Sequence, residues 1–219
     1  MKLTKFTKTT FQLFILTLSF AISNVHAQTA LDKYGIVSQQ VYVAMLGRAG
    51  DRAGLNWLAN SLNSIGAPTD IVNLNRAYDT NYQIRALIDS YGSSAEFQKH
   101  GGGSTDGFLY FVYRTQFNRD PDFNGNAYWR ALIDNGSVTR GRAAVAIMAS
   151  SYGSTDWFIA KEKVEFAIQI DRELTTDCRI NAYNSAIWNG FAVTMLINLR
   201  YSSEVRLAVE NMVRTYGRC

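Results

Sequence analysis

The feature that most constrains the fold of this chain is a pattern that occurs twice, at a spacing of 71 residues. In each copy a Val-Tyr pair precedes an Arg-x-x-Asp-x-x-Gly string, and an aromatic residue follows three positions after the glycine. The first copy consists of Val41, Tyr42, Arg48, Asp51, Gly54 and Trp57, and the second of Val112, Tyr113, Arg119, Asp122, Gly125 and Tyr128. The pattern predicts two divergent copies of one supersecondary unit.

The two copies end alike but differ in length. Tyr91-Gly92-Ser93-Ser94, followed by Phe97, recurs 61 residues later as Tyr152-Gly153-Ser154-Thr155, followed by Phe158. Because the earlier pairs stand 71 residues apart, the first copy holds ten additional residues, which we place between Ala67 and Gln83.

Both copies have the periodicity of helices. Apolar residues recur at i, i+3, i+4 spacing, and strand-type alternation is absent. The aspartate of each string is placed to N-cap the next helix, and the glycine lets that helix approach a neighbour closely. The arginine is placed to neutralise the carbonyl end of the preceding helix or to pair with the aspartate. Core candidates are Tyr42, Met45, Leu46, Leu55, Leu58 and Leu62, then Phe111, Tyr113, Phe117, Trp129, Leu132, Ile133, Val145, Ile147 and Met148.

We therefore expect an all-α fold of two tandem divergent helical repeats, followed by C-terminal helices packed on them. The expected divisions are repeat unit 1 at 28–100, a glycine-rich linker at 101–107, repeat unit 2 at 108–160, and C-terminal helices at 161–219. Ser137 or Thr139 starts a helix in the second unit, and further helices are expected over 156–174, 180–200 and 203–216. Tyr201-Ser202-Ser203-Glu204 resembles the copy-ending motif and leaves a degenerate third unit open.

Residues 1–27 have the three parts of a secretory signal peptide. These parts are Lys2, Lys5 and Lys8, an apolar run from Phe11 to Ile22, and the polar end Val25-His26-Ala27. The apolar run is shorter than the ~20 residues of a membrane-spanning helix. We expect cleavage after Ala27, no membrane insertion of the mature chain, and a periplasmic or secreted location.

Signal cleavage changes the charge of the protein. The whole chain has a formal charge of +4 from 22 basic and 18 acidic side chains, and the signal peptide removes three lysines and no acidic residue. The mature chain is therefore nearly neutral, and its basic residues form no cluster, which argues against a nucleic-acid partner. With 47% hydrophobic residues, it has ample material for a packed core.

Cys178 and Cys219 are the two cysteines of the chain. In an exported protein such a pair is typical of a disulfide, which at this loop length stabilises a fold by roughly 3–4 kcal/mol. The spacing and the lack of a nearby histidine do not suit a zinc site.

The repeated motif resembles a known family. Tyr42 to Trp57, with Tyr113 through Arg119, Asp122, Gly125 and Tyr128-Trp129 as the second copy, resembles the domain-of-unknown-function family 4214, itself similar to the phycobilisome linker domain. The closing Ser-x-Glu-Phe of the family stands here as Ser94-Ala95-Glu96-Phe97 and, less well, as Thr155-Asp156-Trp157-Phe158. The resemblance covers roughly residues 36–160. Leu58, in place of the second aromatic, and Asn118, in place of the glycine before Arg119, depart from the family pattern.

The resemblance implies a helical module for interaction or assembly in an exported bacterial protein, with no catalytic residues assigned. It gives the motif residues a structural role in shaping an inter-helix corner. These residues are Arg48, Asp51, Gly54, Trp57, Arg119, Asp122, Gly125, Tyr128 and Trp129.

A calcium loop is a weaker alternative for the second copy. Asp120, Asp122 and Asn124 stand at positions 1, 3 and 5 of an Asp-x-Asp-x-Asn-Gly string, as the first half of such a loop requires. The twelfth position, which supplies a bidentate glutamate, is Ala131. We therefore expect no cofactor, with calcium as a minor alternative.

Enzymatic alternatives have little support in the residues. His100-Gly101-Gly102-Gly103 matches an oxyanion-hole string, but no Gly-x-Ser-x-Gly accompanies it and His100 is the sole histidine after residue 27. A lysozyme-like hydrolase needs two carboxyl groups, for which Glu96, Glu162, Glu165 and Glu173 are available. The segment Lys161 to Glu165 has the pattern of a solvated charged face.

These observations favour an exported, non-enzymatic helical module that binds another protein or a surface polymer. A cell-wall glycan-binding or glycan-hydrolysing protein is the alternative, because exposed aromatic side chains stack well on sugars.

Overall fold

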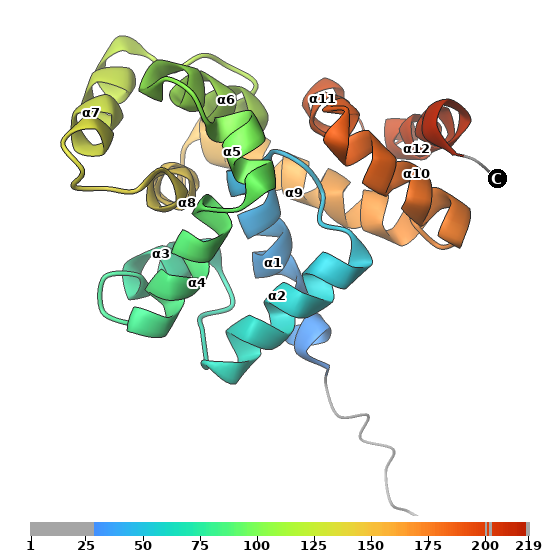
Figure 1. Cartoon of the computed structure of the whole chain (residues 1–219), viewed down its shortest axis with the longest axis horizontal. Helices are drawn as coiled ribbons and strands as arrows, with labels where there is room; N and C mark the ends of the chain where they lie inside the picture. The colour runs from blue at the N-terminus through green and yellow to red at the C-terminus, as the bar shows by residue number, and fades with distance from the viewer. Residues whose placement is uncertain (1–28, 200, 202, 218–219) are drawn as a thin grey trace, which may run out of the picture.

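The computed structural model describes residues 29–199, 201 and 203–217, and this part of the chain is all-helical (Figure 1). The expected fold class is confirmed, since the described residues form helices and no strand. The helices are α1 (Ala30–Leu46), α2 (Arg52–Ser64), α3 (Ile71–Ala77), α4 (Tyr82–Gly92), α5 (Ala95–Gly101), α6 (Thr105–Phe117), α7 (Phe123–Asp134), α8 (Arg140–Ser150), α9 (Thr155–Glu173), α10 (Asp177–Trp188), α11 (Phe191–Asn198) and α12 (Ser203–Tyr216).

Helix α1 forms the centre of the core. It packs against α2, α5, α6, α8 and α9, and its residues Val37, Val41 and Met45 are fully buried. Figure 1 shows α1 in the middle, with α10 to α12 gathered at the far side of α9. Because α9 contacts α1, α6 and α12, it joins the C-terminal helices to the rest of the fold.

Side-chain caps fix the helix starts. Thr29 and Asp32 form a capping box at α1, in which each side chain accepts from the backbone N–H of the other residue. Thr139, rather than Ser137, starts α8, because its hydroxyl accepts from the backbone N–H of Arg142. The ten additional residues expected between Ala67 and Gln83 fall where the short helix α3 lies.

Helix α8 packs across the first half of the chain. It contacts α3 and α4, and a Cβ added at Gly92 would lie 3.1 Å from the Cα of Gly141. The hydroxyl of Thr139 donates to Asp89 at 3.0 Å, and the guanidinium of Arg142 lies 4.5 Å from the ring centre of Tyr78. The residues assigned to the two repeat units therefore interlock in space.

Most of the expected core residues are buried. Tyr42, Met45, Leu46, Leu55, Leu58, Leu62, Tyr113, Phe117, Val145, Ile147 and Met148 belong to the core. The exceptions are Phe111 on α6, which is half-buried, and helix α7, where no residue is fully buried and Trp129, Leu132 and Ile133 are half-buried. This helix lies at the edge of the molecule in Figure 1.

Two expected boundaries were wrong. The helix expected over 180–200 is two helices, α10 and α11, because Gly190 takes a left-handed conformation with φ of 75° and ends the regular path. The linker expected over 101–107 is mostly helical. Gly101 ends α5, and Ser104 caps α6 by accepting from the N–H of Gly107 at 3.1 Å.

The prediction that Lys161 to Glu165 form a solvated face was wrong for Lys163. Its side chain is buried, and the ammonium donates to the carbonyls of Leu196 at 2.6 Å and Ile197 at 3.0 Å. These carbonyls lie at the C-terminal end of α11, where a helix favours positive charge. Lys163 thus fastens α11 to α9, while Lys161, Glu162 and Glu165 are exposed.

Some predictions concern residues outside the described part of the chain. The signal peptide over 1–27 and Cys219 lie there, so export and the Cys178–Cys219 disulfide stay predictions. Among the helices that the structure describes, none has the length and apolar character needed to cross a membrane.

Candidate functional site

The first copy of the motif builds a tight corner between α1 and α2, held by a buried ion pair. The guanidinium of Arg48 donates to both carboxylate oxygens of Glu96, with Nε–Oε1 of 2.5 Å and Nη2–Oε2 of 2.8 Å. A third donor of Arg48 bonds the carbonyl of Ala49 at 2.6 Å. Because Glu96 belongs to α5, this pair ties the corner to a helix 48 residues further along the chain.

The aspartate and glycine of the motif act as expected. Asp51 N-caps α2 by accepting from the N–H of Gly54 at 2.9 Å. The hydroxyl of Tyr42 lies over Gly54 so closely that an added Cβ would clash with it. The glycine is therefore needed for the close approach of α1 and α2. Trp57, by contrast, is exposed and contacts the ring of Tyr91, with 5.7 Å between ring centres.

Helix α10 covers the first corner with Tyr183. Its hydroxyl donates to the carbonyl of Ala49 at 2.7 Å, and its ring centre lies 6.0 Å from the guanidinium carbon of Arg48. The side chain is fully buried, and burial raises the pKa of the Tyr183 hydroxyl well above its ordinary value. The hydroxyl therefore stays protonated and serves as a donor.

The second copy builds a corner of the same kind between α6 and α7. Arg119 donates to both oxygens of Asp156 on α9, with distances of 3.0 Å from Nε and 2.7 Å from Nη2. It also donates to the carbonyl of Asp120 at 3.0 Å. Asp122 caps α7 through the N–H of Gly125 at 2.8 Å, and a Cβ at Gly125 would lie 2.8 Å from the Tyr113 hydroxyl.

The ion pairs show which residues of the two copy-ending motifs are equivalent, and this differs from the alignment expected from the sequence. Ser94 caps α5 and Ser154 caps α9, and the partners of the two arginines, Glu96 and Asp156, stand two residues after these caps. The equivalent positions are thus 60 residues apart at this point, and not 61. The closing motif of the second copy begins at Ser154 rather than at Thr155. The duplication itself stays a prediction, supported by these shared contacts.

The residue before each arginine takes a left-handed conformation. Gly47 ends α1 with φ of 64°, and Asn118 ends α6 with φ of 57°. A Cβ at Gly47 would lie 2.6 Å from Cγ2 of Thr115, so this position excludes a side chain. Asn118 is exposed, and asparagine tolerates this conformation better than most residues. The departure of Asn118 from the family pattern is therefore accommodated.

The two corners differ most in what covers them. Arg48 and Ala49 are buried beneath α10, whereas Asn118 and Asp120 are exposed and the Arg119 side chain is 38% exposed. A hollow of about 370 Å³ remains at the second corner, lined by Arg114, Asn118, Arg119, Asp120 and Ile197. We call this the second-corner hollow.

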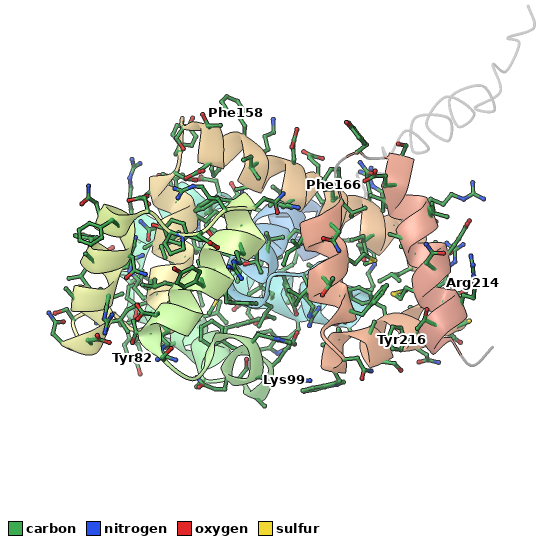
Figure 2. All side chains as sticks on the ribbon, turned by 90° about the horizontal axis from the view of Figure 1, so that it is seen from above. Tyr82, Lys99, Phe158, Phe166, Arg214 and Tyr216 are labelled. Carbon is green, nitrogen blue, oxygen red and sulfur yellow. The ribbon has the colours of Figure 1, made fainter. Side chains whose placement is uncertain are left out.

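Exposed aromatic side chains stand close to the second corner in the sequence. Phe123 is 87% exposed and follows Asp122, and Phe158 is 64% exposed and stands two residues after Asp156. Figure 2 shows Phe158 at the outer edge of the molecule, away from Tyr82. Tyr128 is exposed, and Trp129 is half-buried with its ring centre 5.1 Å from that of Tyr128.

Two of the three expected calcium ligands, Asp120 and Asp122, are engaged with protein groups. The carboxylate of Asp120 accepts from Arg114 at 2.5 Å, and Asp122 caps α7 as described above. Asn124 is exposed on the first turn of α7. Among the described residues, no group of three or more His, Cys, Asp or Glu side chains is arranged to hold a metal ion.

A second hollow, of about 290 Å³, contains a carboxyl group that sequence reasoning missed. Asp171 lies there with Glu165 and Asp32, and its Oδ2 is 2.8 Å from Nη2 of Arg52. Burial raises the pKa of Asp171 above its ordinary value, against the opposing effect of Arg52. No sequence pattern marks this residue, because its burial depends on the packing of α9 against α1.

The remaining predicted residues take structural positions. His100 lies in α5 with its ring stacked on Phe111, at 6.0 Å between ring centres. Burial lowers the pKa of His100. Glu173 pairs with Arg179 at 2.7 Å, and Glu162 is exposed on α9. Glu96 is taken up by Arg48, so these glutamates are not brought together in one site.

Comparison with known proteins gives one match. No curated protein and no solved structure matches the chain. The model of the family described as domain of unknown function (DUF4214) matches residues 88–153. These residues run from the end of α4 through the second corner to α8 and include Glu96, Arg119 and Asp122. The similarity to the phycobilisome linker domain stays a prediction. Residues 88–153 of this chain thus match the DUF4214 family model, which is consistent with the resemblance seen in the repeated motif.

Proposed function

We propose that this protein is an exported, non-enzymatic helical module that binds another protein or a surface polymer. The observation that carries the proposal is the contrast between the two corners. The first is buried, with Tyr183 of α10 bonded to Ala49, and the second leaves a hollow of about 370 Å³, with the exposed Phe123 and Phe158 close to this corner in the sequence. Exposed aromatic groups are frequent anchors of protein interfaces.

The charge distribution supports a partner other than nucleic acid. Arginines on several helices are already paired with acidic side chains, among them Arg114 with Asp120 and Arg130 with Asp106. Paired guanidinium groups of this kind leave little net positive surface to follow a phosphate backbone.

A capture experiment tests the proposed function. We expect the immobilised protein to recover a specific protein from envelope extract, and Phe123→Ser with Phe158→Ser to reduce the recovery about tenfold or more, because exposed aromatic anchors are lost. The matched control is Tyr82→Ser, which changes an aromatic side chain that is 79% exposed on α4. Recovery of no protein by the unaltered chain, together with retention on purified peptidoglycan, would contradict the proposal and favour a glycan partner.

The second candidate function is glycan hydrolysis, favoured by the hollow that contains Asp171. A glycosidase of this type needs one carboxyl group whose pKa is raised by burial and a second carboxyl group beside it. Asp171 has the first property, and Glu165 and Asp32 line the same hollow.

A turbidity assay separates the two functions. We expect no fall in the turbidity of a cell-wall suspension when the protein is added, because the pairing of Asp171 with Arg52 gives that carboxyl group a structural role. A fall that disappears in Asp171→Asn, and persists in the matched Asp177→Asn, establishes hydrolysis instead. Asp177 is an exposed carboxyl group in the first turn of α10.

A further inference from the structure

We propose that the second-corner hollow accepts a tyrosine side chain from a helix of a partner protein, in the way that the first corner accepts Tyr183 of α10 within this chain. The inference rests on the proposed function and names the binding site and the chemistry of the partner. Its basis is the correspondence between the two corners and the different coverage of their surfaces.

The acceptor that α10 uses has a counterpart in the second corner. At the first corner the carbonyl of Ala49 accepts from Arg48 at 2.6 Å and from the Tyr183 hydroxyl at 2.7 Å. At the second corner the carbonyl of Asp120 accepts from Arg119 at 3.0 Å. A carbonyl oxygen has two lone pairs, so the same two-donor arrangement is available at Asp120.

The surface around this acceptor is open where its counterpart is closed. Val43, Gly47, Arg48 and Ala49 are buried in the first corner. The residues 71 positions later are Arg114, Asn118, Arg119 and Asp120, and these four line the second-corner hollow. A volume of about 370 Å³ lies within the range of protein binding pockets, roughly 300–1,000 Å³.

The arginine of each corner faces aromatic rings. Arg48 lies 5.1 Å from the ring centre of Tyr42 and 6.0 Å from that of Tyr183, which α10 brings. Arg119 lies 5.0 Å from the ring centre of Tyr113 and 6.0 Å from that of Phe117, both on the preceding helix α6. A guanidinium attracts aromatic faces, so Arg119 can receive the ring of a docked tyrosine in addition.

The face that α10 presents defines the chemistry of the partner helix. Its buried residues are Ala182, Tyr183, Ala186 and Ile187. Helix α10 packs mainly on α11 and α12, and Tyr183 is the side chain through which it contacts the first corner, at Ala49 and Arg48. We therefore expect a partner helix that presents a tyrosine side chain to the hollow, as α10 presents Tyr183 to the first corner.

A second copy of this chain is not the expected occupant of the second-corner hollow. Its own Tyr183 is fully buried at its first corner, so α10 cannot reach another molecule without leaving the fold. Phe123 and Phe158 are exposed and stand within two residues of the Arg119 partners Asp122 and Asp156, so they are apolar side chains available to a partner.

A helix-stabilised peptide with the sequence of residues 176–190 and Cys178→Ser tests the proposal, because this segment carries Tyr183, which contacts the equivalent corner within the chain. We expect saturable binding to the full chain, measured by fluorescence anisotropy, with the largest amide NMR shifts at Arg114 and Asn118 to Asp120. In the peptide, Tyr183→Phe removes one hydrogen bond, so we expect about fivefold weaker binding.

Two variants of the protein complete the test. We expect Arg119→Gln to weaken peptide binding about tenfold while the melting temperature falls by only a few degrees, since this arginine is 38% exposed. The matched control is Arg130→Gln at the opposite end of the α6–α7 pair, whose arginine is 54% exposed and ion-paired. We expect Arg130→Gln to bind the peptide with the affinity of the unaltered chain.

Four outcomes overturn the inference while leaving the proposed function open. The first is no saturable binding at millimolar peptide. The second is that the largest amide NMR shifts occur at Arg48 and Ala49, which would mean that the peptide replaces α10 at the first corner. The third is equal affinity of the Tyr183→Phe peptide. The fourth is concentration-dependent self-association of the chain that the peptide blocks. Failure of the envelope capture, in contrast, rejects the proposed function itself.

Discussion

Replacing Glu96 by glutamine is expected to lower the free energy of unfolding by about 3–5 kcal/mol, because the change leaves a buried charge without its partner. The Arg48 side chain is 4% exposed and that of Glu96 is 16% exposed, so water cannot replace the lost carboxylate. Two of the donors of Arg48 lose the carboxylate acceptor at once. Denaturant unfolding followed by circular dichroism measures the change.

The matched control is Asp156→Asn in the second corner. The Arg119 side chain is 38% exposed and that of Asp156 is 22% exposed, so solvent screens this pair and the expected loss is about 1 kcal/mol or less. The same bidentate contact is thus tested at two degrees of burial. Equal losses for Glu96→Gln and Asp156→Asn would contradict the assignment of the first pair as the stronger constraint.

Gly47→Ala is expected to lower the free energy of unfolding by about 2–5 kcal/mol, from two causes that add. Gly47 has φ of 64°, a conformation that a Cβ disfavours. The new Cβ would also lie 2.6 Å from Cγ2 of Thr115, on α6. Thr115 is buried and its hydroxyl bonds the carbonyl of Phe111 at 2.9 Å, so it has little room to move. Thermal and denaturant unfolding measure this effect.

Asn118→Gly is the matched control for the left-handed conformation. This position has φ of 57° and is exposed, so glycine removes steric strain without opening a cavity, and the expected change is about 1 kcal/mol or less in either direction. A loss for Gly47→Ala no larger than the effect at Asn118 would show that the contact with Thr115 does not constrain the corner.

The local parts of the corners could be predicted from the sequence. Asp51 and Asp122 cap the helices that follow them, and Gly54 and Gly125 lie beneath tyrosine hydroxyls. Capping and close approach depend on residues a few positions apart or on one neighbouring helix, so the motif encodes them directly.

The longer-range contacts could not be predicted. The sequence offered the carbonyl end of the preceding helix or Asp51 as the partner of Arg48, but the closest Arg48–Asp51 contact is 4.0 Å and the bidentate partner is Glu96 on α5. Tyr183 and Asp171 carry no sequence signal either, because their burial arises only when α9 and α10 pack on the first half of the chain. Lys163 stands among charged residues and therefore has the sequence pattern of a surface lysine. Its burial likewise arises from packing, because its ammonium bonds the end of α11.

The packing of α8 on α3 and α4 has a consequence for the synthesis of the protein. The backbone of Gly141 lies against that of Gly92, and Met45 of the central helix α1 lies within 3.2 Å of a Cβ placed at Gly141. A ribosome-bound chain that ends before residue 140 therefore exposes this side of α1 and of α4. The first half cannot finish folding until the second has emerged, so the two motif copies make one cooperative unit rather than two modules that fold in turn.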